Sequence, residues 1–517
     1  MTLHLSGLIS GLDTETLVTT LLENSIYQTR IDNTEEEVTE LEDEVSAWSE
    51  ISGLMTTLTD SLYTLYSSSK DTWDLFTATS SDEDVLTATA DKDAVAGTYK
   101  IVVSTLAQAH SVASSKASGL TGDSDANADT DLIAAGVLTD GDTFTIEGVT
   151  FTVGGDEYGQ TVDGAESITT LMNKINYANT QGEFDNDVTA TIIDNSLVIT
   201  RGDTGSTEIV MSEGTGTVLQ DLEIFSAAGT YNEDNELVTA QNASFTVNGI
   251  SVSRSGNSLT DVINGVTLEL AGEGTATLTI ARDTDTVKNA ILDFITNYNA
   301  VIKAIESYTE VDLSDADDPE VGALQGDTLA RMIPYNLRAL ATKLNSDFTS
   351  ENASYTYDGS TGVLNSLQAL GVWTGLTDDD EEDDEDDSDD DSDLESYANR
   401  LSLQDEDKLD YMLENYFDEM EQFFKGLSGG EEDGWAEGMY NYSYNASDST
   451  SGQITRKTSS LNDDLNDKET LIDDLTDDLD DYETLLWDKF SVMEEAMSTM
   501  SSELVSLCNE LGIETDD

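Results

Sequence analysis

The C-terminal part of the chain carries a long heptad pattern, and this pattern constrains the fold more than any other feature. From Ile454 to Leu511, apolar or tolerated residues recur in alternating steps of four and three, with one extra step of four between Leu486 and Phe490. A spacing of about 3.5 residues with a single stutter predicts a helix that packs one side against another helix. Because the run exceeds an ordinary globular helix, it favours a coiled coil or a helical hairpin.

The N-terminal part carries a similar pattern from Ile31 to Leu65, with one extra step of three between Trp48 and Ile51. We expect Asp13 to cap the helical segment that precedes this pattern. Both patterns fit an internal helical core, and both also fit pairing of the two ends with each other and with neighbouring chains. The residues expected to form this contact are here called the terminal seam, and they are Leu41, Val45, Trp48, Leu461, Leu465, Ile472, Leu475, Leu479 and Leu486.

The middle of the chain, residues 74–282, is rich in Thr, Val, Ile, Gly and Ser with period-two alternation, which is typical of strands. Hairpin turns are predicted at Glu147-Gly148, Asp194-Asn195 and Asn248-Gly249. The motif FTIEG at 144–148 recurs as FTVNG at 245–249, which indicates two related β-rich units. Helical periodicity returns after residue 285. The sequence therefore predicts an α+β protein in which long terminal helices, paired as a coiled coil or helical bundle, flank a multi-unit antiparallel β-rich insertion.

The charge of the chain is extreme, with 107 acidic and 21 basic residues and a formal net charge of −86. Nucleic acid is excluded as a partner, because binding it requires a basic surface. Since the acidic residues are spread along the whole chain, we expect a halophilic protein that works in a salt-rich environment. One block, residues 378–393, holds 14 acidic residues in 16. We expect this block to be a disordered loop without a defined metal site, because it lacks the glycine and ligand spacing of a calcium loop.

The sequence contains no motif that indicates chemistry. The two histidines, His4 and His110, lie far apart, and no nucleotide-binding loop, nucleophile elbow or zinc-protease motif occurs. We therefore expect a protein that is not an enzyme and that holds no cofactor and no metal. No cationic start followed by an apolar core and no apolar run of 18 residues occurs, so neither a Sec signal peptide nor a membrane span is expected.

Several segments resemble the bacterial flagellar filament-capping proteins, also called the flagellar hook-associated protein 2 family. The resemblance begins with GLISGLDTETLVTTLL at 7–22 and AGTYKIVVSTLAQAHSV at 96–112. Its most specific part is FTVNGISVSRSGNSLTDVINGVTLEL at 245–270, followed by ARDTDTVKNAILDFITNYNAVI at 281–302. LQGDTLARM, LQALGV and LSLQDEDKLDYML then follow in the family's order. The acidic block departs from the family, because it interrupts a segment that is short in typical members.

This resemblance implies a structural protein at the distal tip of the flagellar filament that promotes the insertion and polymerisation of exported flagellin, and hence motility. The implied partners are further copies in a homo-oligomeric ring, flagellin, hook–filament junction proteins and a cytoplasmic export chaperone at the C-terminal end. The implied location is extracellular, after export by the flagellar type III apparatus. The alternatives are a surface adhesin or other filament-associated binding protein, and a flagellin or hook-junction protein.

The resemblance also implies a domain order in which helical legs carry a β-rich head. Residues 1–73 would form the N-terminal leg and 431–517 the C-terminal coiled-coil leg. Residues 74–125 with 241–283 would form one head domain, and 126–240 would form a second head domain inserted in the first. Residues 284–430 would form a helical leg domain that includes the acidic block.

Overall fold

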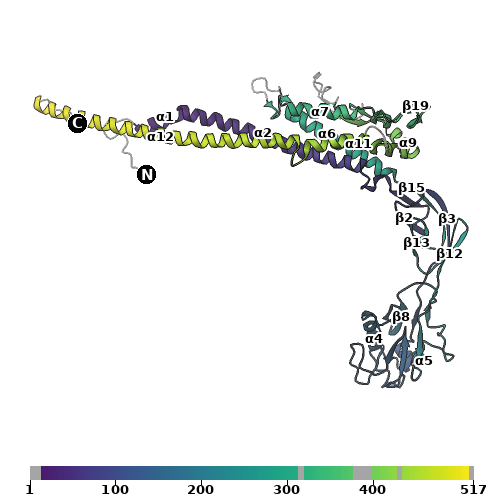
Figure 1. Ribbon diagram of the computed structural model, residues 1–517. Coiled ribbons are helices and arrows are strands. Elements are labelled where there is room, and N and C mark those ends of the chain that lie inside the picture. Colours follow the sequence, from purple (N-terminus) through teal and green to yellow (C-terminus); the bar gives the residue numbers. More distant parts are fainter. Residues whose placement is uncertain (1–12, 185, 313–319, 376–398, 428–432, 512–517) are drawn as a thin grey trace, which may run out of the picture. The chain divides into compact units, whose positions relative to one another are not determined.

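The computed structural model describes residues 13–184, 186–312, 320–375, 399–427 and 433–511 (Figure 1). The chain divides into two compact units. The helical unit comprises residues 1–73 and 284–517, and the β unit comprises residues 74–283. The finer division into five domains stays a prediction. The predicted α+β class is confirmed, because long helices at both ends flank a middle region built from antiparallel strands.

The helical unit is built around three helices from the two ends of the chain. They are α1 (Thr14–Glu23), α2 (Ile26–Tyr66) and α12 (Gln453–Leu511). Asp13 caps α1 as predicted, because its side chain accepts a hydrogen bond from the Thr16 backbone N–H at 3.1 Å. That hydrogen bond also lowers the pKa of the Asp13 carboxyl group.

Shorter elements complete the helical unit. The helices are α6 (Thr284–Thr309), α7 (Thr328–Ala341), α9 (Glu406–Asn415), α10 (Phe417–Lys425) and α11 (Trp435–Ser447), with 3-10 turns η1 (Asp71–Trp73) and η2 (Leu367–Leu370). The strand pairs are β16 (Val311–Asp312) with β17 (Glu320–Val321), β18 (Ser354–Tyr357) with β19 (Ser360–Val363), and β20 (Val372–Thr374) with β21 (Leu401–Leu403). One continuous core joins α2, α6, α7, α9, α10 and α11, and it also includes the start of α12. Aromatic side chains fill much of it, including Trp48, Trp73, Phe294, Phe424 and Trp435.

The β unit contains two hydrophobic cores. The first core lies in a five-stranded sheet of order β1-β15-β3-β11-β12 and a three-stranded sheet of order β13-β14-β2. These strands are β1 (Phe76–Ser80), β2 (Leu86–Ala90), β3 (Gly97–Thr105), β11 (Ala243–Val247), β12 (Ile250–Arg254), β13 (Ser258–Ile263), β14 (Val266–Leu270) and β15 (Gly274–Arg282).

The second core lies between the sheets β10-β4-β8-β7 and β6-β5-β9 and three helices. These elements are β4 (Ser111–Ala113), α3 (Ala117–Thr121), β5 (Thr143–Ile146), β6 (Val149–Thr152), α4 (Ile168–Thr180), β7 (Val188–Ile193), β8 (Ser196–Arg201), β9 (Met211–Glu213), α5 (Val218–Asp221) and β10 (Glu236–Val238). All of the strand pairs are antiparallel, and the period-two alternation of apolar residues places one side of each strand in a core.

The repeated FT-x-x-G motif forms the same hairpin in each core. Phe144 lies opposite Phe151 in the β5–β6 hairpin, and Phe245 lies opposite Val252 in the β11–β12 hairpin. Each motif ends in a two-residue turn whose residues both have positive φ, namely 43° and 82° at Glu147-Gly148 and 50° and 84° at Asn248-Gly249. Such turns match the twist of the strands that they join, which explains why each copy ends in glycine.

Candidate functional site: the paired terminal helices

The two ends of the chain pair through α2 and α12, which lie side by side in Figure 1. All nine residues of the terminal seam lie on these two helices. Trp48 and Leu461 belong to the main core of the helical unit, with exposed fractions of 0% and 4%. Leu41 and Val45 are partly buried against the same core.

Further along α12 the seam becomes more accessible. Leu475 and Leu486 are buried, whereas Leu465, Ile472 and Leu479 are half-buried. The structure therefore brings the seam residues to an intrachain helix contact. Their participation in a contact between chains stays a prediction.

Two lysines on α12 form ion pairs with glutamates of α2 that show the two helices to be antiparallel. Lys457 forms ion pairs with Glu44 at 3.5 Å and with Asp327 at 3.0 Å. Burial alone would lower the pKa of Lys457, but its hydrogen bond with Asp327 and the attraction of both carboxylates raise that pKa overall. Further along, Lys468 pairs with Glu37 of α2. Two of the chain's few basic residues therefore lie where α12 meets the acidic side of α2.

The side of α12 that faces away from α2 is acidic. The segment 461–483 carries eleven acidic residues and one basic residue. Among them Asp467, Asp474 and Asp481 recur every seven residues, and all three are exposed. This spacing places them on one side of the helix, so they form a continuous stripe that is here called the acidic stripe of α12.

The C-terminal end of α12 exposes apolar residues instead of burying them. Met497, Met500, Leu504 and Leu507 continue the heptad spacing, with exposed fractions of 36%, 68%, 61% and 53%. These four residues are here called the apolar end of α12. A contiguous apolar stripe on a solvent-facing helix indicates a surface that another protein segment covers.

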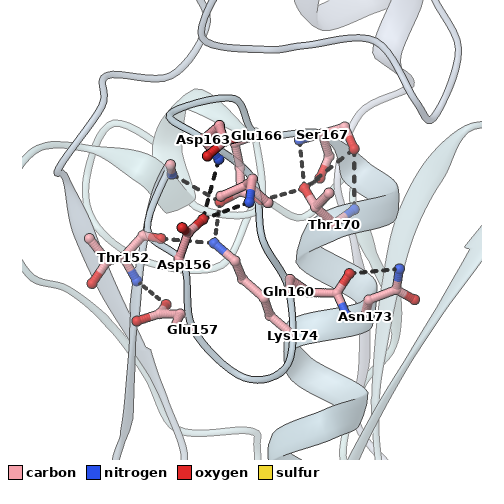
Figure 2. A network of polar contacts seen from close by, with 12 residues as sticks. Thr152, Asp156, Glu157, Gln160, Asp163, Glu166, Ser167, Thr170, Asn173 and Lys174 are labelled. Carbon is pink, nitrogen blue, oxygen red and sulfur yellow. Dashed lines mark hydrogen bonds and ion pairs between the residues drawn. The ribbon is translucent and has the colours of Figure 1, made fainter.

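Among the described residues, the most deeply buried ion pair lies in the β unit, between Glu166 and Lys174 (Figure 2). Both side chains are 0% exposed, and their charged atoms are 2.6 Å apart. The Glu166 carboxylate also accepts hydrogen bonds from the Gly154 backbone N–H, at 3.1 Å, and from the Thr170 hydroxyl, while Lys174 donates to the Thr152 carbonyl at 3.0 Å. The charges of Glu166 and Lys174 are therefore both satisfied by partners inside the protein. This arrangement is typical of a structural ion pair and not of a reactive group.

This pair fastens the loop between β6 and α4. Gly154 in that loop has φ of +70°, a backbone conformation that favours glycine, and a Cβ there would also displace the Asp140 carboxylate. Asp156 accepts hydrogen bonds from the backbone N–H groups of Val162 and Asp163, and these bonds lower the pKa of its carboxyl group. The loop is therefore held by carboxylates at several points (Figure 2).

Two more buried polar groups were not predicted from the sequence. Arg201 pairs with Glu147 at 2.9 Å, and Glu147 also accepts a hydrogen bond from the Val210 backbone N–H at 2.8 Å. His110 is fully buried, its Nδ1 accepts a hydrogen bond from the Ile209 backbone N–H at 3.1 Å, and burial lowers its pKa. A sequence signal for these groups was a charged residue within an apolar alternation, as at Arg201 on β8.

The described residues include no group of three or more His, Cys, Asp or Glu side chains placed to hold a metal ion. None of the described helices combines the length and the apolar character that crossing a membrane requires. The acidic block 378–393 lies outside the described residues.

Comparison with known proteins gives one consistent result. The model of the flagellar hook-associated protein 2 C-terminus matches residues 240–502, and that of the flagellar hook-associated protein 2 N-terminus matches residues 10–110. The A-type flagellar hook-associated protein 2 of Pseudomonas aeruginosa is 30% identical over 362 residues, which cover 65% of this chain and 69% of that protein. The flagellar hook-associated protein 2 of Salmonella typhimurium is 35% identical over 176 residues, which cover 32% of this chain and 38% of that protein.

Among solved structures, the flagellar cap protein FliD D1-D2-D3 domains from Escherichia coli are 24% identical with a TM-score of 0.49, covering 80% of this chain and 99% of that chain. The chain spans less than two thirds of the length of the Salmonella relative, because the matched residues cover 38% of that protein.

Proposed function

Because the chain belongs to the flagellar hook-associated protein 2 family, we propose that it caps the distal tip of a flagellar filament and promotes the insertion and polymerisation of exported flagellin. The proposed protein acts outside the cell as a homo-oligomeric ring, after export by the flagellar type III apparatus. Its proposed partners are flagellin, the hook–filament junction proteins and, before export, a cytoplasmic chaperone that binds the C-terminal end. The role is structural and chaperone-like and involves no bond chemistry.

The observation that carries this proposal is the form of the helical unit. The two ends of the chain pair through α2 and α12, and α12 continues beyond the pair into its exposed apolar end. A helix with an uncovered apolar stripe suits a leg that contacts other helical segments, whether from a filament subunit or from a chaperone. The seam residues Leu475 and Leu486 would stiffen this leg as far as the uncovered part.

A gene deletion tests the proposal in the source bacterium. Without a cap, cells should lose motility and release unpolymerised flagellin into the medium, and the full-length chain should restore both. Loss of surface attachment with normal swimming would instead indicate an adhesin and contradict the proposal.

The leg assignment has its own test in the same strain. Complementation with the Met500→Asp, Leu504→Asp variant should fail to restore motility, because two carboxylates interrupt the apolar end of α12. The matched control is Ile250→Asp, since Ile250 is 70% exposed but lies in the β unit, and this variant should swim. Full motility of the first variant would show that the apolar end is not needed at the tip.

A further inference from the structure

The solvent-facing side of α7 has the opposite character to α2 and α12. Between Asp327 and Asp347 the sequence contains no Asp or Glu, and it contains Arg331, Arg338 and Lys343. In a chain with 107 acidic and 21 basic residues, α7 and the residues directly after it therefore carry a local positive charge. Such a patch attracts acidic surfaces and repels basic ones.

The helix places these residues where a partner can reach them. Ala330, Ile333, Leu337 and Ala341 are buried, so the opposite side of the helix faces solvent. That side is here called the α7 face, and its residues are Arg331, Met332, Tyr335 and Arg338.

The α7 face combines exposed apolar surface with arginines that form no salt bridge among the described residues. Met332 and Tyr335 are 49% and 73% exposed. Arg338 donates a hydrogen bond to the Asn399 side-chain oxygen at 3.4 Å. No carboxylate in the described part of the chain forms a salt bridge with Arg331 or Arg338. An exposed tyrosine between two arginines is a composition typical of the energetic centre of protein interfaces.

The acidic stripe of α12 is opposite in charge to the α7 face and has the same seven-residue spacing. Arg331 and Arg338 are seven residues apart, and so are Asp474 and Asp481. Seven residues of helix rise about 10.5 Å, so two helices with nearly parallel or antiparallel axes can bring both pairs into register. Asp467 extends the stripe by another seven residues. Within one chain α7 packs on α6 and α11, and α12 packs on α2, which leaves both surfaces facing outward.

We propose that the α7 face of one copy binds the acidic stripe of α12 of a second copy. This inference rests on the proposed function, because it assigns a contact within the proposed homo-oligomer. Two chains of charge −86 repel each other over most of their surfaces, so a stable contact requires a local region of opposite sign. Every copy presents both surfaces, and they are different surfaces, so the contact is heterologous and can close into a ring.

Two charge-reversed chains test this contact. One is Arg331→Glu, Arg338→Glu, and the other is Asp474→Lys, Asp481→Lys. The exposed Lys92 of the β unit supplies the control Lys92→Glu. Self-association of each full-length chain is measured by sedimentation velocity at one salt concentration at which the wild type assembles, and circular dichroism confirms that each variant is folded.

Each charge-reversed chain alone should associate at least about tenfold more weakly than the wild type, because its interface then pairs like charges. A one-to-one mixture of the two should associate again, since each contact between one variant and the other joins opposite charges. The control should associate like the wild type.

Assembly of both variants like the control, or no recovery in the mixture, would overturn the proposed contact while leaving the oligomer intact. Unchanged self-association together with lost flagellin binding would assign the α7 face to flagellin and likewise refute the proposal. A wild type that stays monomeric at every salt concentration would overturn the proposed ring and this contact together.

Discussion

The buried Glu166–Lys174 pair makes a quantitative prediction about the β unit. Replacement of Lys174 by Met removes the positive charge but leaves the Glu166 carboxylate enclosed, since both side chains are 0% exposed. Breaking one side of a buried ion pair costs about 3–5 kcal/mol, because the remaining charge keeps its desolvation penalty without its partner. The free energy of unfolding of the β unit should fall by this amount.

The double variant Lys174→Met, Glu166→Gln separates the charge from the packing. The Gln carbonyl oxygen can still accept the hydrogen bond from the Gly154 backbone N–H, and its amide can donate to the Thr170 hydroxyl, which also acts as an acceptor. Because Gln buries no charge, this variant should recover roughly 2 kcal/mol of the loss. The control is Lys116→Met, because Lys116 pairs with Asp194 in the same unit but both side chains are more than half exposed. Exposed pairs contribute up to about 1 kcal/mol, so this variant should differ little from the wild type.

Native-state hydrogen exchange of peptides from residues 143–201 provides the measurement, because it reports opening of the second core directly. The five tryptophans of the chain all lie outside residues 74–283, so their fluorescence checks that the helical unit is unchanged. If Lys174→Met lowers stability no more than Lys116→Met, or if the double variant is no better than the single one, the argument from buried charge is wrong.

Three further predictions concern other parts of the chain. Burial lowers the pKa of His110 in the folded protein, so protonation of this histidine opposes folding. The β unit should therefore be fully stable above about pH 6.5 and should lose stability as the pH falls from there through the folded pKa. The His110→Asn variant should show a smaller loss of stability over this pH range, as measured by hydrogen exchange. Leu475→Ala should destabilise α12 by about 2–5 kcal/mol in the same assay, whereas the 47% exposed Leu485 should tolerate Ala within about 0.5 kcal/mol. Replacing 378–393 by a Gly-Ser linker should preserve folding and self-association, and tight stoichiometric calcium binding by that block would contradict its assignment as a loop.

Local patterns were sufficient to predict the helices and the hairpins. The heptad spacing predicts α2 and α12 because each helix must bury one side, and the structure buries that side along much of its length. The turn pairs were equally informative, because few residues adopt positive φ without strain. Asp194 and Asn195, predicted as a turn, have φ of 48° and 62° between β7 and β8.

The order of the strands could not be predicted in the same way. β15 lies between β1 and β3, although about 170 residues separate it from β3 in the chain, because alternation shows which side of a strand is buried but not which strand pairs with it. The two halves of the five-stranded sheet therefore come from either side of the second core in the sequence.

Buried charges were missed because composition suggested that every charge faces solvent. Lys174 falls three residues after Leu171 and four before Ala178, on the buried side of α4, and this position was the available signal. The α7 face could not be predicted either. Helical periodicity shows which residues are exposed, but it does not show which of the exposed arginines lack a carboxylate neighbour. In the heptad pattern of α12, Lys468 stands at a position that is otherwise apolar or tolerated, and its ion pair with Glu37 explains why this position accepts a lysine.

The balance between repulsion and burial leads to a final prediction, that folding of the terminal helices and assembly both increase with salt. Like charges four residues apart cost a few tenths of a kcal/mol each in a helix, and 461–483 carries eleven acidic residues, so α12 is opposed by its own charge. At about 10 mM salt the screening length is roughly 30 Å and whole copies repel, whereas at about 1 M it is roughly 3 Å and only direct contacts matter. Contacts such as those proposed between the α7 face and the acidic stripe are short, so they should persist while long-range repulsion is removed. Circular dichroism and light scattering across a salt series should therefore show helix content and oligomer mass rising together. A fully helical, fully assembled protein in dilute buffer would show that the acidic surface does not control either process.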